Sequence, residues 1–215
     1  MIKQYIRYWL RDQIINRRNR ARLEGKTEVS IFANDCLGGV ICHDLNLKLL
    51  SPTVNYYMSP DNYIRFLSNL DFYLDNRLTD PVREEDGTFT AMIGDVVVHL
   101  GHCSSYEEAY AHWEERKKRV RKESMCVIMD DRNGCTEEHM KQFLDLPYEH
   151  KVFLSHLPNP DPRVCYIKGF EEEPCVGILT TYKHYGIKRI YDAFDWVSFL
   201  NGVTCETPSS VQESW

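Results

Sequence analysis

The chain has 215 residues, of which 43% are hydrophobic and 27% charged, and its formal charge is −6. These values are typical of one globular domain, and no apolar run approaches the roughly 20 residues that a membrane-spanning helix needs. No signal-peptide core is found either, so we expect a cytoplasmic protein with reduced cysteines. The eight cysteines include no C-x-x-C pair, which argues against a structural zinc site.

The charge is unevenly distributed along the chain. Residues 1–26 hold eight basic and two acidic residues, a charge of +6, so the remainder, with eighteen basic and thirty acidic residues, carries −12. Residues 1–24 lack Gly and Pro, and their apolar residues recur at helical spacing beside arginines, which predicts a basic amphipathic helix within an N-terminal segment, residues 1–27. Such a helix suits an anionic membrane surface, or it packs on the body or on another subunit. We expect no nucleic-acid partner, because the acidic body repels phosphate.

The body, residues 28–203, alternates apolar strand-like runs with helix-like segments, and a polar tail, residues 204–215, follows it. Ser59, Ser105 and Thr136 are expected N-caps of three helices. The polar stretch 75–87 is expected to be a loop or a short excursion of the chain. The expected strands are residues 29–33, 52–57, 96–100, 126–129, 152–154 and 164–167, and the last expected helix spans residues 191–200.

This alternation predicts a single α/β domain with three layers, α/β/α, around a mainly parallel mixed sheet, with the short late strands as a candidate antiparallel edge. In such folds the loops at the carboxyl ends of parallel strands share one rim. The rule gathers residues 34–39, residues 102–105, residues 130–134 and the segment around His156 into one candidate site.

Cys36 is the strongest candidate for a catalytic nucleophile in that site. It lies in a strand-to-helix turn, where backbone amides and the helix dipole would stabilise a thiolate and cradle an oxyanion. His102 or His156, arriving from other strands, is the expected general base, whereas His43 lies two helical turns away on the face that Cys36 shares. The alternative is a structural cysteine in a tightly packed turn.

Asp130 and Asp131 end a buried strand, where a carboxylate can act as a base, hold Mg²⁺ or bind sugar hydroxyls. The alternative is that they cap the turn or pair with Arg132. His102 has a structural alternative too, and Lys168 is either a phosphate-binding cation or part of a surface turn. The candidate substrate-binding residues are four beside Cys36, namely Asn34, Asp35, Gly38 and Gly39, together with His43, Arg132, His156 and Lys168.

The glycine pair 38–39 does not identify a cofactor. It lacks the third glycine of the dinucleotide fingerprint and the Gly-Lys-Ser/Thr of a P-loop, so we expect neither nicotinamide dependence nor ATPase activity. The cofactor, if any, stays unknown, and no metal ligand is assigned.

Five segments together resemble a bacterial family described as exopolysaccharide-biosynthesis proteins: NDCLGGVICHDL (34–45), SPTVN (51–55), WEERKKR (113–119), VIMDDRNGCT (127–136) and YIKGFE (166–171). The resemblance covers nearly the whole chain after about residue 27. It implies a three-layer α/β/α fold and a role in cell-surface polysaccharide or capsule synthesis. Asp35 stands where the family often has an amide.

We therefore expect a transferase, acyl or glycosyl, whose partners are an activated sugar or acyl donor and a polysaccharide precursor. Residues 1–24 would hold it at the inner face of the cell membrane. Two alternatives stay open: a non-catalytic membrane-associated scaffold or binding protein of polysaccharide assembly, and a cysteine-dependent hydrolase.

Overall fold

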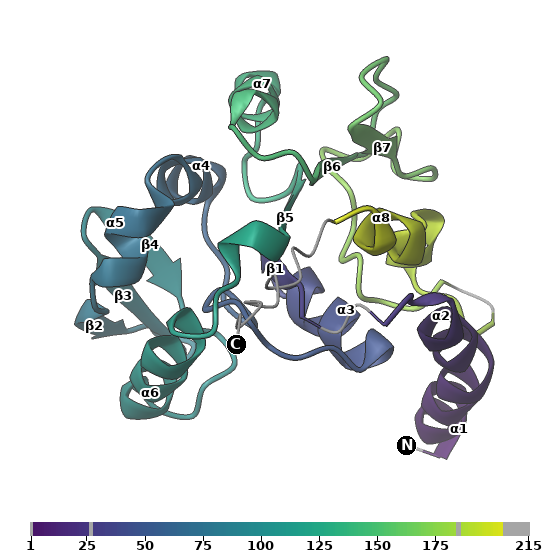
Figure 1. The fold of residues 1–215 in the computed structure, drawn as a ribbon, viewed down its shortest axis with the longest axis horizontal. Helices are drawn as coiled ribbons and strands as arrows, with labels where there is room; N and C mark the ends of the chain where they lie inside the picture. The colour runs from purple at the N-terminus through teal and green to yellow at the C-terminus, as the bar shows by residue number, and fades with distance from the viewer. Residues whose placement is uncertain (1, 26–27, 184–185, 204–215) are drawn as a thin grey trace, which may run out of the picture.

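The computed structural model describes residues 2–25, 28–183 and 186–203. Its centre is a four-stranded parallel sheet in the order β1-β5-β6-β7 (Figure 1). The pairings are all parallel, with Phe32 opposite Val127 and Met129 opposite Phe153. The late strands therefore extend the parallel sheet, and the expected antiparallel edge is wrong. The strands are β1 Ser30–Ala33, β5 Met125–Asp130, β6 Lys151–Ser155 and β7 Val164–Tyr166.

A separate antiparallel sheet has the order β2-β3-β4 and is formed by β2 Thr79–Arg83, β3 Phe89–Ile93 and β4 Val96–His99. Two expectations are corrected here. The stretch 75–87 is not only a loop, because it contains β2, whose residues are all exposed. The strand expected at residues 96–100 belongs to a hairpin turning at Gly94 (φ +59°) and not to the parallel sheet.

Helices cover both faces of the parallel sheet, which confirms the α/β class. Side chains alternate between the faces of the central strands: Phe32, Val127 and Met129 pack in one cluster, and Ile31 and Ile128 in the other. The first cluster also contains the hairpin sheet, α4 Pro60–Ser68, α5 Leu70–Asp75, α6 Tyr106–Lys117 and α7 Glu137–Asp145. The second contains α3 Leu37–Leu45, η3 Ile190–Ala193 and α8 Trp196–Gly202. A short 3-10 turn, η2 Lys122–Ser124, leads into β5.

The three expected N-caps are confirmed. Ser59, Ser105 and Thr136 each accept a hydrogen bond from a backbone N–H three residues on, at the starts of α4, α6 and α7. The strand expected at residues 52–57 is wrong, because this stretch forms turns in which only Tyr57 pairs, as an isolated bridge with His99. The last expected helix begins as the 3-10 turn η3 and continues as α8.

The N-terminal helix is divided by a wider turn. It runs as α1 Ile2–Arg11, a π-helical segment η1 Asp12–Asn16 and α2 Arg17–Arg22. It lies at one edge of the molecule beside α8 (Figure 1). Among the described residues, no helix is long and apolar enough to cross a membrane. The expected tail, residues 204–215, lies outside the part of the chain that the structure describes.

Candidate active site

The carboxyl ends of β1 and β5 are joined by two side-chain hydrogen bonds. The Asn34 amide donates to Asp130 Oδ1 (3.1 Å), and the Asp130 backbone N–H donates to Asn34 Oδ1 (3.2 Å). Both side chains are buried, with 1% of each residue exposed. Asn34 therefore fixes the end of β1, which Cys36 follows, against the end of β5 at Asp130.

Asp35 and Arg132 complete this junction. The Asp35 carboxylate accepts the backbone N–H of Leu37 (2.8 Å) and pairs with Arg132 Nη1 (3.2 Å). The Arg132 backbone N–H in turn donates to Asp130 Oδ1 (3.2 Å). Because Asp35 occupies the first amide of α3, this amide is not available to an oxyanion, contrary to the expectation for the turn.

Two buried carboxyl groups thus lie close to Arg132: its guanidinium pairs with Asp35, and its backbone N–H donates to Asp130. Burial raises the pKa of Asp35, and burial together with the charge of Asp35 raises the pKa of Asp130, while Arg132 opposes both shifts. Asp130 Oδ2 is buried and has no hydrogen-bond partner among the described residues. The arrangement favours an ionised Asp35 paired with Arg132 and a protonated Asp130.

Cys36 and His102 meet at this junction. Cys36 is the N-cap of α3 without a capping side-chain bond, and its Sγ lies 3.0 Å from His102 Nε2. Burial, then the charge of Asp35, raises the pKa of the thiol to about 11, although Arg132 opposes the shift. Burial and the neighbouring carboxylate therefore act against the thiolate that was expected at the helix N-terminus.

The pair opens into a cavity of about 410 Å³. Sequence reasoning placed Asp35, Cys36, His102 and Arg132 near one another, and all four line this cavity. Asn133 lies in the expected segment 130–134, whereas Tyr57, Ile178 and Thr180 were missed. Ile178 and Thr180 belong to an irregular stretch with no periodic signal, and Tyr57, which stacks on His99 at 4.0 Å between ring centroids, was assigned to a strand. The complete lining is Asp35, Cys36, Tyr57, His102, Arg132, Asn133, Ile178 and Thr180.

Asp131 and His156 form a second contact beside the first. Asp131 Oδ2 accepts the backbone N–H of His156 (2.7 Å) and lies 2.5 Å from His156 Nδ1, while Asp131 Oδ1 accepts the backbone N–H of Val176 (2.8 Å). Asp131 thereby ties the end of β6 to the segment that carries Ile178. His156 is not among the residues lining the cavity, so His102 is the histidine that the structure brings to Cys36.

The glycine pair at the start of α3 has a packing role. A Cβ on Gly38 would lie 3.3 Å from Ala33 Cβ, and one on Gly39 would lie 2.5 Å from Asn55 Oδ1 and 3.1 Å from Val54 Cγ1. Close approach of α3 to β1 and to residues 54–55 accounts for both glycines.

Two expected substrate-binding residues lie elsewhere. His43 is exposed on α3 and contacts Tyr8 (hydroxyl to Nε2, 3.0 Å) and Asp44 (Nδ1 to Oδ1, 3.2 Å). Lys168 is exposed in a turn beside a different cavity, with Tyr166 and Lys183. Neither lines the cavity at Cys36.

The carboxylates of this region have little capacity left for a cation. Both oxygens of Asp131 and one of Asp130 already accept hydrogen bonds. Within the described ranges, no three His, Cys, Asp or Glu side chains are grouped so that they could hold a metal ion.

Comparison with known proteins gives the family. The model of a family described as "Domain of unknown function (DUF1919)" matches residues 6–201. A Haemophilus influenzae (strain ATCC 51907 / DSM 11121 / KW20 / Rd) protein that carries the name "Uncharacterized protein" is 37% identical over 188 residues, which are 87% of this chain and 90% of that protein. Neither description mentions a polysaccharide, so the resemblance drawn from the five motifs stays a prediction. The chain belongs to the DUF1919 family.

Proposed function

We propose that the protein is a cysteine-dependent acyltransferase in which Cys36 is the nucleophile and His102 the general base. The observation that carries the proposal is the 3.0 Å contact between Cys36 Sγ and His102 Nε2 at the wall of a cavity. A thiol with a raised pKa is protonated at rest, so it needs a base within hydrogen-bond reach to become a nucleophile.

The reaction proceeds in two balanced steps. Sγ attacks the acyl carbonyl of an activated donor while its proton passes to His102 Nε2. The bond from the acyl carbon to the leaving group breaks, the leaving group takes that proton, and a thioester remains on Cys36. An acceptor hydroxyl then gives its proton to His102 and attacks the thioester, and the thiol is regenerated with the proton returned from His102. No oxidant, reductant or metal is required.

Arg132 suits an anionic donor. Its guanidinium is about one quarter exposed at the cavity and, within the described part of the chain, makes one ion pair, with Asp35. Guanidinium groups recognise phosphate and carboxylate through several N–H donors, so a donor linked to a nucleotide or a phosphate fits this wall. Thr180 and Asn133 supply polar groups, and the exposed Ile178 supplies an apolar contact.

An acyl donor fits the site better than a nucleotide sugar with a bound metal. The oxygens of Asp131 are engaged by His156 and Val176, and Asp130 is buried, is not among the residues lining the cavity and has a raised pKa. The groups expected to hold Mg²⁺ or act as a base in glycosyl transfer are therefore already used in joining strands and loops.

The biological setting rests on the resemblance. The acceptor hydroxyl would belong to a cell-surface polysaccharide precursor, and the protein would work at the inner face of the cell membrane, held there by residues 1–24. Two basic side chains of that helix, Arg17 and Arg18, have no charge partner among the described residues, which supports this location.

The test uses the full chain and a panel of acyl-CoA thioesters, read by intact mass and peptide mapping. We expect an added acyl mass on Cys36 that hydroxylamine removes, absent in Cys36→Ala and strongly reduced in His102→Ala. Cys165→Ala, which removes a partly buried cysteine of β7, is the matched control and should acylate normally. Acylation that persists in Cys36→Ala, or none with any donor, would refute the proposal.

A second candidate is a non-catalytic binding protein of polysaccharide assembly. The raised pKa of Cys36 favours it, and His102 Nδ1 has no orienting partner among the described residues. In that case Cys36→Ala and wild type would support polysaccharide production equally in a producing cell. A hydrolase differs from the transferase only in taking water as acceptor, and release of free acid from the thioester would identify it.

A further inference from the structure

The N-terminal helix carries an outward apolar stripe. Tyr5, Ile6, Trp9 and Ile14 are 74%, 52%, 61% and 56% exposed. The other exposed large hydrophobic residues are scattered over the rest of the described chain, apart from Tyr8 on the same helix. Single exposed hydrophobic residues are ordinary, but a group of aromatic and aliphatic side chains on one helix marks an interaction surface.

The same helix is fixed to the body through its polar residues. Arg11, only 1% exposed, pairs with Asp44 and Asp192. Arg7 donates to backbone carbonyls of residues 183 and 186, and Arg20 donates to the carbonyl of Asp44 (2.9 Å). An amphipathic helix normally buries its apolar face. Here buried ion pairs hold the helix with that face turned away from the body.

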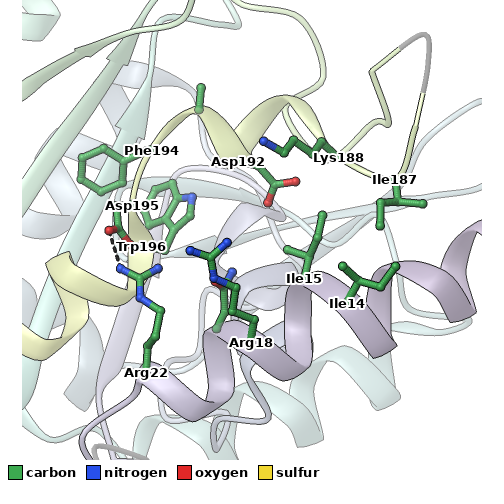
Figure 2. A pocket seen from close by; sticks show the side chains of 12 residues that line it. Ile14, Ile15, Arg18, Arg22, Ile187, Lys188, Asp192, Phe194, Asp195 and Trp196 are labelled. Atoms are coloured by element: carbon green, nitrogen blue, oxygen red, sulfur yellow. Dashed lines mark hydrogen bonds and ion pairs between the residues drawn. The ribbon is translucent and has the colours of Figure 1, made fainter.

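A groove adjoins the stripe at Ile14. It has a volume of about 440 Å³ and lies between η1–α2 and residues 187–196 (Figure 2). Ile15, Ile187 and Trp196 form apolar walls, and the Arg22–Asp195 ion pair closes one end. Arg18 projects into this groove from α2, and Lys188 lies on the opposite side (Figure 2).

The groove holds positive charge that has no partner among the described residues. The side chains of Arg18 and Lys188 are exposed and make no hydrogen bond or ion pair within the described ranges, and the same is true of the Arg17 side chain on the adjoining turn. Asp192 and Asp195, which also line the groove, are already paired with Arg11 and Arg22. Apolar walls below unpaired cations fit a ligand with a negative headgroup and a hydrocarbon body.

We propose that this surface docks on an anionic lipid bilayer. Tyr5, Ile6, Trp9 and Ile14 insert at the level of the headgroups, and the groove takes the phosphate of an anionic lipid between Arg18 and Lys188. The helix from residue 2 to residue 22 is roughly 30 Å long and lies parallel to the membrane plane. Aromatic rings at the interface and cations that reach the phosphates are the usual anchors of such helices.

Charge separates a membrane from a second copy of the chain as the occupant. In a two-fold dimer through this face, the +6 segments of the two copies would lie against each other and repel. A bilayer with anionic lipids instead attracts the +6 segment, while the −12 remainder is repelled and stays in solvent. The inference deepens the proposed membrane location and is independent of the thiol chemistry.

The experiment measures vesicle binding of the full chain by flotation, with phosphatidylcholine vesicles containing 30% phosphatidylglycerol and with pure phosphatidylcholine. We expect tight binding only to the anionic vesicles. Arg18→Gln with Lys188→Gln should weaken it by about 25-fold, since each cation near the surface contributes about fivefold. Trp9→Ala should weaken it by about tenfold or more, because it removes an apolar anchor.

The matched controls change the same kinds of side chain away from the proposed membrane surface. Arg77→Gln with Lys118→Gln removes two exposed cations without described partners, and Phe72→Ala removes an aromatic ring that is 46% exposed. Both should bind like wild type, as should Cys36→Ala, so that failure of the acyltransferase proposal is distinguished from failure of this one. Equal binding to neutral vesicles, equal loss in the control variants, or no binding accompanied by a dimer that Trp9→Ala dissociates would overturn the inference.

Discussion

Arg11 on the N-terminal helix and Asp44 on α3 form an ion pair from which water is almost entirely excluded. The distance between Arg11 Nε and Asp44 Oδ2 is 3.0 Å, and their side chains are 1% and 3% exposed. Tyr191 donates to the same oxygen of Asp44 and accepts from Arg11, and Asp192 binds Arg11 Nη1 at 2.6 Å. A closed polar network therefore attaches the helix, and the buried residues that the structure describes on this helix, Arg11 and Asn16, are polar.

Removal of one partner from this network should be costly. In Arg11→Met the carboxylates of Asp44 and Asp192 stay buried without their main cation, and we expect a loss of about 3 kcal/mol or more in the free energy of unfolding. Urea denaturation measures it. Arg22→Gln breaks the exposed pair with Asp195 and should cost less than about 1 kcal/mol. Equal effects of the two substitutions would contradict the network's role.

The local signals of the fold were readable in the sequence, and the long-range pairings were not. Ser59, Ser105 and Thr136 cap helices as expected, because a cap depends on residues three positions apart. The prediction of a strand at residues 52–57 is wrong, because these buried residues form turns. Residues 96–100 read as a strand in either sheet, and only tertiary pairing assigns them to the hairpin.

The candidate site was found partly for the wrong reason. Residues 102–105 were expected beside Cys36 because they would follow a parallel strand, yet they follow β4 of the hairpin. His102 still reaches Cys36 because Tyr57, just after the turn at residues 52–55, pairs with His99. The burial of Arg11 and the raised pKa of Cys36 have no sequence signal, since both depend on the surroundings in the folded chain.

The packing role of the glycine pair leads to a stability prediction. In Gly39→Ala the new Cβ would lie 2.5 Å from Asn55 Oδ1 and 3.1 Å from Val54 Cγ1, so we expect a loss of about 1–3 kcal/mol. Gly101→Ala, where a Cβ meets nothing within 4 Å, is the matched control and should stay within about 0.5 kcal/mol. Thermal or urea denaturation measures both.

A second-site change tests whether the clash is the cause. Asn55 has φ +67°, which glycine adopts without strain, so Asn55→Gly removes the obstructing side chain at a compatible position. Gly39→Ala should then cost less in the Asn55→Gly background than in wild type. An unchanged cost would show that Asn55 is not the obstruction.

The raised pKa of Cys36 predicts its alkylation behaviour. With a pKa of about 11, iodoacetamide labelling should accelerate about tenfold per pH unit and show no plateau between pH 6 and 9.5. Asp35→Asn removes the carboxylate that raises this pKa, so labelling at a given pH should be faster, whereas Arg132→Gln should slow it. Peptide mapping gives the rate at Cys36, with Cys165 in the same sample as the control. A plateau near pH 7 would contradict the burial argument.

Asp130 should make stability depend on pH. Its pKa is higher in the folded state than the unfolded value of about 4, so the folded state binds the proton more tightly and the free energy of unfolding falls as the pH rises above about 4. Asp130→Asn keeps the acceptor for Asn34 and cannot ionise. Relative to wild type, it should gain more than about 1 kcal/mol in stability between pH 5 and pH 8, measured by urea denaturation. If the free energies of unfolding of the two proteins change with pH in the same way, ionisation of Asp130 does not destabilise the folded state.

Asp131 links the strand ends to the cavity wall, and this gives a prediction about local opening. Its Oδ1 accepts the N–H of Val176, two residues before Ile178, and its Oδ2 holds His156. Asp131→Ala leaves a buried N–H without an acceptor, so the segment carrying Ile178 and Thr180 should open more readily. Hydrogen exchange at the Val176 amide should accelerate at least about tenfold, while that of Val127, in the centre of β5, changes only with global stability. If Val176 keeps its protection, the cavity wall is held by contacts other than Asp131.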